Sequence, residues 1–166
     1  MGLITTLISG GQTGADRAAM DVALAWGIDV RGWVPRGRVA EDGVIAERYP
    51  GLRETASADP AERTRLNIQD ADGSLIISHA PLQGGSLLAL ETALQLPRPV
   101  LHLDLSRVGM GEAVTECAEW IRAHRIAVLG VGGPRASEDP HIYDATVMLL
   151  SGVLVSLTGD RQTIAD

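Results

Sequence analysis

The stretch LISGGQTGAD (residues 7–16) ends an apolar run in a glycine-rich turn that contains one threonine and one aspartate. The apolar run, Leu3–Ser9, has the length of a strand, and apolar residues then recur with helical spacing from Ala15 to Trp26. Gly27 follows as the C-terminal stop of that helix. The stretch therefore predicts a strand, a turn and a helix. The turn is either an ordinary strand-to-helix connection or a cradle for a phosphate.

The same alternation of strands and helices continues through the rest of the chain. Apolar runs predict further strands at Ile28–Val34, Ser74–Ser78, Val100–Leu105 and Ile126–Val131. Segments with helical period predict helices at about 59–70, 87–96, 111–124 and 139–157. The first and last of these have an aspartate as N-cap and a proline after it, Asp59 and Asp139 being the caps. Residues 35–58 show no clear period and predict a long loop.

Strands that alternate with helices predict a Rossmann-like three-layer αβα sandwich around a parallel sheet of about five strands. We expect one domain over residues 1–157 and a flexible tail over residues 158–166. With the strands numbered along the chain, we prefer the order 2-1-3-4-5 to 3-2-1-4-5. In the preferred order the first and third strands are neighbours, so that the loops after them face one pocket. Ligands of such folds bind beyond the carboxyl ends of the strands.

The composition is that of a globular protein, with 45% hydrophobic and 21% charged residues. The net charge of −7 argues against broad nucleic-acid binding through phosphate neutralisation. Neither a signal peptide nor an apolar run of about 18 residues is evident, so we expect a soluble cytoplasmic protein that does not enter a membrane. The single cysteine, Cys117, forms no internal disulfide and is expected to be a packed core thiol.

Four loops are expected at the carboxyl edge of the sheet: GGQTGAD, PRGRVAEDG, HAPLQGGS and GGPRAS. In the first loop the glycines allow close backbone approach, and the helix N-terminus that follows favours an anion. This loop lacks the Lys-Ser/Thr pair of a P-loop, and the third loop repeats its design at a second helix N-terminus. The candidate ligand-binding residues of these two loops are Gly10, Gly11, Gln12, Thr13, Gly14, Asp16, Gly84, Gly85 and Ser86.

Positive charge for a phosphate is expected from three arginines, because the guanidinium group suits phosphate geometry. They are Arg36, Arg38 and Arg135. Gly133 in the last loop and Asn67 in the helix before the third strand complete the candidate set. Since no Cys/His cluster has the spacing of a zinc site, we expect no metal bound by protein side chains.

Five stretches resemble one known family: ISGGQTGADRAAMDVAL, GWVPRGRVAEDGVIAERYP, ADPAERTRLNIQDADGSLII, PLQGGSLLALETA and GGPRASEDPHIY. They follow one another from Ile8 to Tyr143 and resemble the molybdenum carrier proteins, also called molybdenum cofactor carrier proteins. That family is a circularly permuted branch of the Rossmann-like SLOG superfamily. The resemblance implies a domain that binds the molybdenum cofactor (molybdopterin), a pterin carrying a phosphate, and that often forms a homo-oligomer.

By motif match, the resemblance also implies two phosphate-binding loops, Gly11–Gly14 and Gly84–Ser86. Arg38, Asn67 and Arg135 match polar positions of the family's motifs and are expected in the same pocket. We therefore expect a protein that binds and protects the molybdenum cofactor, or a related phosphorylated pterin or nucleotide, without catalysis. The resemblance implies a molybdoenzyme or a cofactor-synthesis protein as partner, with no role for nucleic acid or a membrane.

A relative within the same superfamily favours an enzyme instead. The lysine-decarboxylase-like phosphoribohydrolases carry G-G-x-G-T-x-x-E, and GGSLLALE (residues 84–91) keeps both glycines and Glu91. It has Leu87 and Leu88 in place of the second Gly-Thr pair. Hydrolysis of an N-glycosidic bond in a nucleotide is therefore the alternative function, with Glu91 or Asp42 as the acid–base group. Asp42 can instead brace the long loop, and a nucleotide or ADP-ribose sensor is a further alternative.

Overall fold

The structure, a computed structural model, describes residues 4–159. Leu3, the expected start of the first strand, and residues 160–166 of the expected tail lie outside the described residues. A six-stranded sheet has the order β5-β2-β1-β8-β6-β7, with parallel pairing throughout. Its strands are β1 (Thr6–Ile8), β2 (Asp29–Val34), β5 (Leu52–Glu54), β6 (Gly73–Ser78), β7 (Val100–Asp104) and β8 (Val128–Gly132).

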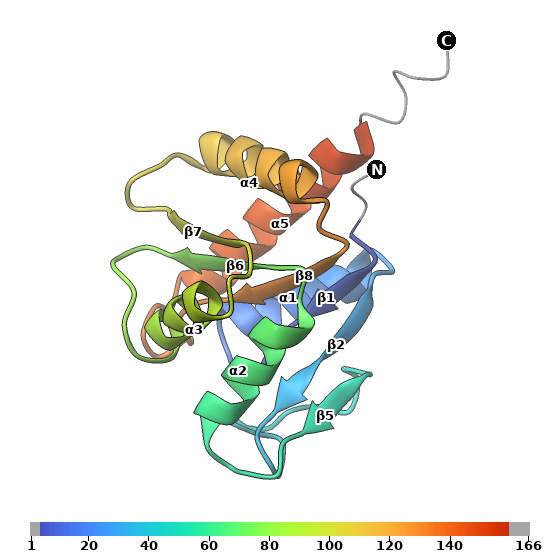
Figure 1. Cartoon of the computed structure of the whole chain (residues 1–166), viewed down its shortest axis with the longest axis vertical. Coiled ribbons are helices and arrows are strands. Elements are labelled where there is room, and N and C mark those ends of the chain that lie inside the picture. The colour runs from blue at the N-terminus through green and yellow to red at the C-terminus, as the bar shows by residue number, and fades with distance from the viewer. Residues whose placement is uncertain (1–3, 160–166) are drawn as a thin grey trace.

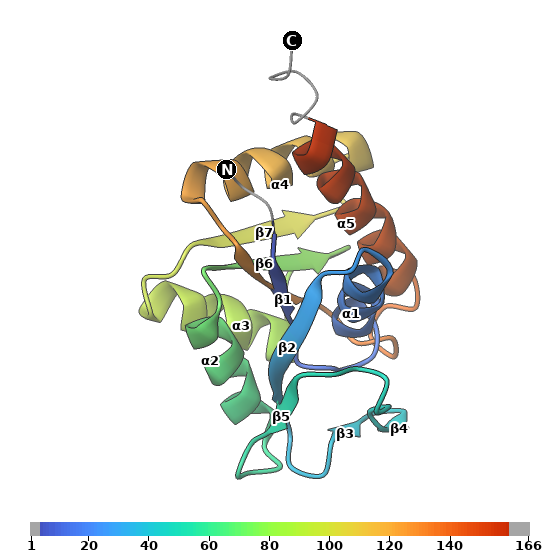
Figure 2. The same cartoon turned by 90° about the vertical axis from the view of Figure 1, so that its right-hand side faces the viewer.

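Helices cover both faces of this sheet (Figures 1 and 2). They are α1 (Ala15–Ala25), α2 (Pro60–Asp70), α3 (Gly84–Gln95), α4 (Met110–His124) and α5 (Ile142–Gly159). α2 and α3 pack together on one face, while α5 packs against α1 and α4 on the other. The expected α/β class and three-layer sandwich are therefore confirmed. The expected packed thiol is confirmed too, because Cys117 is fully buried in α4.

The preferred strand order was wrong, because β8 lies between β1 and β6. Gly130 of β8 is in register with Ile8 of β1 on one side and with Ser74 of β6 on the other. The sequence did not reveal this arrangement, since all three strands are short buried runs and no residue in them marks a pairing partner. The last strand of the chain therefore occupies the centre of the sheet.

The expected long loop over residues 35–58 contains three short strands. β3 (Val39–Ala40) and β4 (Gly43–Val44) form an antiparallel pair, and β5 pairs in parallel with β2 at the edge of the sheet. Sequence periodicity missed β5 because it has only three residues, two of them charged and exposed. The sheet therefore has one strand more than expected.

Two helix starts differ from expectation. α3 begins at Gly84, so the glycines expected in a preceding loop form its first turn. α5 begins at Ile142, because Asp139 Oδ1 accepts the N–H of His141 and holds a turn ahead of the helix. The start of α2 is as expected: Asp59 caps it through the N–H of Ala61, and Pro60 is the first helical residue.

α5 is long and apolar enough to meet the criteria of a membrane-spanning helix, although the sequence analysis expected no such run. Its 18 residues have a mean hydropathy of 1.5, which is enough by length and composition to cross a membrane. Buried core helices of soluble proteins meet the same criteria, and α5 packs Leu149, Leu150 and Val153 into the core beside α1 and α4. The α/β fold is of the soluble type, with α5 as one of its packed helices.

A cluster of hydroxyl groups around Asp21 ties α1 to α5 and to the loop before β5. Tyr49 and Tyr143 both donate their hydroxyl groups to the Asp21 carboxylate, and Arg48 donates to it at 3.0 Å. Burial, followed by the hydrogen bond to Asp21, raises the pKa of each tyrosine to about 12. Burial likewise raises the pKa of the Cys117 thiol to about 12.

These raised pKa values predict a loss of stability in alkali. Each group has a higher pKa in the folded chain than its ordinary value of 10.0 for tyrosine or 9.0 for cysteine. Its contribution is therefore complete below about pH 9 and is lost as the pH rises toward about 12. Thermal unfolding followed from pH 8 to pH 12 should show Tm falling over this range. The Tyr49→Phe, Tyr143→Phe double variant should show a shallower fall, and an unchanged slope would contradict the assignment.

Candidate functional site

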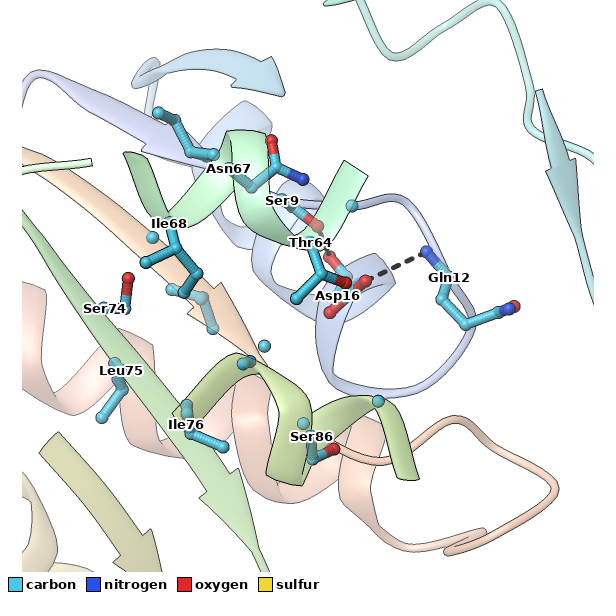
Figure 3. Close-up of a pocket in the computed structure, with 18 of the residues that line it drawn as sticks. Ser9, Gln12, Asp16, Thr64, Asn67, Ile68, Ser74, Leu75, Ile76 and Ser86 are labelled. Carbon is cyan, nitrogen blue, oxygen red and sulfur yellow. Dashed lines mark hydrogen bonds between the residues drawn. The ribbon is translucent and has the colours of Figure 1, made fainter. Parts of the chain in front are cut away.

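A cavity of about 100 Å³ lies between α2, α3 and the sheet (Figure 3). β1, β6 and β8 form its floor, and the loops after β1 and β8 form its open end. Its polar and glycine lining residues are Ser9, Gly10, Gln12, Asp16, Arg63, Thr64, Asn67, Ser74, Gly85, Ser86, Gly130, Gly132, Gly133, Arg135 and Glu138. The cavity thus lies at the carboxyl edge of the sheet, where a Rossmann-like fold binds ligands.

The floor of the cavity is open because β8 carries glycine at two alternate positions. A Cβ added to Gly132 would have Asp16 Oδ1, at 3.7 Å, as its nearest neighbour, whereas one on Gly130 would lie 3.1 Å from Ser74 Oγ. Ser74 is only 3% exposed, and its hydroxyl has no hydrogen-bond partner among the described residues. Because buried hydroxyl groups are nearly always paired, an orphan in a cavity wall suits a polar atom of a ligand.

The glycine-rich loop after β1 is closed by its own side chains. Gly11 donates its N–H to Ser9 Oγ at 3.2 Å, and Gln12 donates to Asp16 Oδ2 at 3.2 Å. Thr13 donates its N–H to Gln12 Oε1 at 3.0 Å. These are the N–H groups that a phosphate cradle would have to offer, so the geometry lends the predicted cradle at Gly11–Gly14 no support.

Backbone conformation and close packing both require glycine at positions 11 and 14 of this loop. Gly11 and Gly14 have φ angles of 74° and 76°, which side chains rarely tolerate. A Cβ on Gly14 would lie 2.4 Å from the carbonyl oxygen of Pro134, and one on Gly11 would lie 2.8 Å from Ile45 Cδ1. The loop connects β1 to α1 and packs closely against the loop that leads into α5.

The N-terminus of α3, in contrast, is open. Its N-cap residue, Gln83, makes no side-chain hydrogen bond to the helix. The first N–H groups of a helix have no partner within the helix, and among the described residues none is found for Gly85 or Ser86. Both residues line the cavity, which therefore receives unpaired N–H groups and the positive end of the helix dipole.

Two arginines and two carboxylates face the same cavity. Arg63 of α2 donates to the carbonyl oxygen of Gly10 and has its Nη1 4.0 Å from Asp16 Oδ2. Burial raises the pKa of the Asp16 carboxyl above its usual range, although Arg63 and the Gln12 N–H act in the opposite direction. Arg135 lies with its Nε 3.0 Å from Glu138 Oε1. The positive groups are therefore held in place by carboxylates.

The structure brings most of the sequence-predicted residues to this cavity. Those that line it are Gly10, Gln12, Asp16, Asn67, Gly85, Ser86, Gly133 and Arg135. Gly11, Thr13, Gly14, Arg36, Arg38 and Gly84 do not line it, and Gly84 lines the adjoining cavity instead. Arg38 donates instead to the carbonyl oxygens of Ile45 and Ala46, so the geometry lends its predicted ligand role no support.

Asn67 lines the cavity, but its amide is engaged elsewhere. It accepts the N–H of Trp33 at 2.7 Å and donates to the carbonyl oxygen of the same residue at 2.9 Å. Asn67 therefore fixes α2 against β2 and holds the cavity wall in position. Arg63, one helical turn earlier, was missed by the sequence analysis, and its four-residue spacing from Asn67 was the signal that could have found it.

The acid–base candidates of the hydrolase alternative lie away from the cavity. Glu91 is exposed on α3 and does not line the cavity. Asp42 pairs with Arg17 at 2.9 Å and braces the long loop against α1. Glu41 beside it accepts hydrogen bonds from the hydroxyl groups of Thr13 and Ser137, which joins this loop to the one before α5.

A second cavity, of about 400 Å³, adjoins the first and shares Ser86 and Glu138 with it. His79, at the end of β6, lines it and has its Nδ1 2.6 Å from Asp139 Oδ2. Burial raises the pKa of the Asp139 carboxyl, but hydrogen bonds from His79 and from the His141 N–H outweigh this, so the pKa is lowered overall. No cluster of three or more metal-ligating side chains is present within residues 4–159.

Comparisons with known proteins cover nearly all of the chain. The model of the circularly permutated YpsA SLOG family matches residues 7–154. No curated protein matches the sequence. A crystal structure named "Putative molybdenum carrier protein", from Syntrophus aciditrophicus SB, is similar at 50% sequence identity with a TM-score of 0.89. The similarity covers 91% of this chain and 95% of that one.

Proposed function

Because the chain belongs to the circularly permutated YpsA SLOG family, we propose that it binds a small phosphorylated ligand and carries it without transforming it. The proposed ligand is the molybdenum cofactor or a related phosphorylated pterin or nucleotide. The name of the similar crystal structure, a molybdenum carrier, supports this class of ligand. The proposed location is the cytoplasm.

One observation carries the proposal: the open N-terminus of α3 in the wall of the cavity. A phosphate at this position would accept hydrogen bonds from the N–H groups of Gly85 and Ser86. Arg63 and Arg135 line the same cavity, and their guanidinium N–H groups are donors that suit phosphate geometry, while Asp16 and Glu138 beside them balance their charge. The proposed phosphate site is thus the second of the two expected loops.

The geometry gives no support to the two residues named as acid–base groups of a hydrolase. A hydrolase would need an acid–base group within hydrogen-bond reach of the ligand. Neither Glu91 nor Asp42 lines the cavity, and Asp42 is held in an ion pair with Arg17. The further parts of the proposal, a homo-oligomer and a partner among molybdoenzymes or cofactor-synthesis proteins, rest on the family resemblance.

Filling the floor of the cavity should weaken ligand binding without unfolding the protein. Alanine at Gly132 adds a methyl group whose nearest protein atom is 3.7 Å away, so the fold accepts it. The methyl group takes space from the ligand, and overpacking of this kind costs about 1–3 kcal/mol. We expect Gly132→Ala to weaken the binding of molybdenum cofactor or guanosine 5′-monophosphate about tenfold, measured by titration calorimetry.

Gly111→Ala is the matched control, because a Cβ there meets no atom within 4 Å and the residue lies on α4, away from the cavity. It should bind as the unaltered protein does. Retention of added molybdenum cofactor through gel filtration, with slower decay of the bound cofactor, is the direct test of carriage. No retention, together with release of free base from a nucleoside monophosphate, would overturn the proposal in favour of the hydrolase.

A further inference from the structure

The first cavity is too small for the whole of the proposed ligand. It measures about 100 Å³, whereas pockets for ligands of drug size measure about 300–1,000 Å³. The adjoining cavity measures about 400 Å³ and shares Ser86 and Glu138 with the first. A ligand whose phosphate group binds beside Ser86 in the first cavity can therefore place its remaining atoms in the second cavity.

We propose that the second cavity binds the ring-bearing part of a phosphate monoester and that His79 Nε2 accepts a hydrogen bond from an N–H or O–H group of that part. This proposal rests on the phosphate site proposed above. It assigns the β6–α3 and β8–α5 loops, which lie at the same end of the sheet in Figure 1, to one extended ligand site.

The pairing with Asp139 determines what His79 offers to a ligand. The ionised Asp139 carboxylate can only accept, so the imidazole Nδ1, 2.6 Å from Oδ2, carries the hydrogen. When the ring is neutral, Nε2 has a free lone pair, and no partner is found for it among the described residues. The other Asp139 oxygen accepts the N–H of His141 at 2.9 Å, which fixes the carboxylate in place.

The remaining walls suit a flat ring. Pro81, Leu82 and Pro134 line the cavity with apolar surface. Its polar side chains are those of Ser78, His79, Gln83, Ser86, Glu138 and Asp139. Ligand sites commonly combine apolar walls with a few placed polar groups that fix orientation. Pterins and purines have this character, with flat faces and N–H groups at the ring edge.

The test compares ligands that reach one cavity with ligands that reach both. Inorganic phosphate occupies only the first cavity, whereas guanosine 5′-monophosphate and neopterin monophosphate extend into the second. We expect the full chain to bind the two monoesters at least about tenfold more tightly than inorganic phosphate in titration calorimetry. His79→Ala should remove about tenfold of the monoester affinity and leave phosphate affinity unchanged. His141→Ala, a nearby histidine that lines neither cavity, is the matched control.

Asp139→Asn tests whether the lone pair on His79 Nε2 accepts a hydrogen bond from the ligand. Asparagine can still accept the His141 N–H, but its amide N–H group would donate to His79 Nδ1 and move the ring hydrogen to Nε2. The variant should lose monoester affinity to the same extent as His79→Ala while keeping Tm and phosphate affinity. The ¹⁵N chemical shifts of the imidazole should report the changed tautomer.

The outcomes separate the two proposals. If phosphate binds but the monoesters gain nothing over it, or if His79→Ala binds them as the unaltered chain does, the ring site is overturned and the phosphate site stands. If neither phosphate nor the monoesters bind, the phosphate site is overturned and the ring site is overturned with it.

Discussion

Gly14→Ala should lower the free energy of unfolding by about 3 kcal/mol or more, the largest stability effect expected of a single methyl group in this loop. Two costs add at this position. The residue has a φ angle of 76°, and the new Cβ would lie 2.4 Å from the carbonyl oxygen of Pro134, a backbone atom that cannot move aside alone. Urea unfolding followed by circular dichroism measures the loss.

Gly27→Ala separates these two costs. Gly27 has a nearly equal φ angle of 69°, but a Cβ there meets no atom within 4 Å. It should therefore lose only about 1 kcal/mol, the cost of the backbone conformation. If both variants lost the same free energy of unfolding, the close approach between Gly14 and Pro134 would contribute nothing to the loss. The positive φ angle alone would then explain the glycine.

Gly85→Pro should weaken the binding of inorganic phosphate or a phosphate monoester by roughly 10-fold to 100-fold, the largest binding effect expected of one substitution. Proline removes the N–H group that we assign to the phosphate, and a hydrogen bond to a charged group contributes about 1.5–3 kcal/mol. Proline is tolerated in the first turn of a helix, and the space around a Cβ at Gly85 is open. Titration calorimetry with each ligand measures the change.

The control for this variant is Gly85→Ala, which also adds a Cβ but keeps the N–H group. It should lose less phosphate affinity than the proline variant, and both variants should keep the helical signal in circular dichroism. Unchanged phosphate affinity in both the proline and the alanine variant would place the anion elsewhere in the cavity. An equal loss in both would show that the Cβ, and not the missing N–H group, disturbs binding.

The sequence alone determined five helices and five of the sheet strands, without β3, β4 and β5, and the sheet edge at which the proposed ligand site lies. Apolar runs of strand length and segments of helical period are local signals, and Asp59 and Pro60 marked the start of α2 correctly. The rule that parallel strands present their loops at one edge then predicts that Asp16, Ser86 and Arg135 lie together, and all three line the first cavity.

Only the tertiary structure decided which of these loops has unpaired backbone N–H groups that can donate to a phosphate. GGQTGAD and PLQGGS are both glycine-rich sequences. In the first, the side chains of Ser9, Gln12 and Asp16 accept hydrogen bonds from the backbone N–H groups, whereas the N–H groups of Gly85 and Ser86 in the second have no such partner. The strand order was also beyond sequence reasoning. It depends on which strands meet across distant parts of the chain, and such pairings leave no period or spacing in the local sequence.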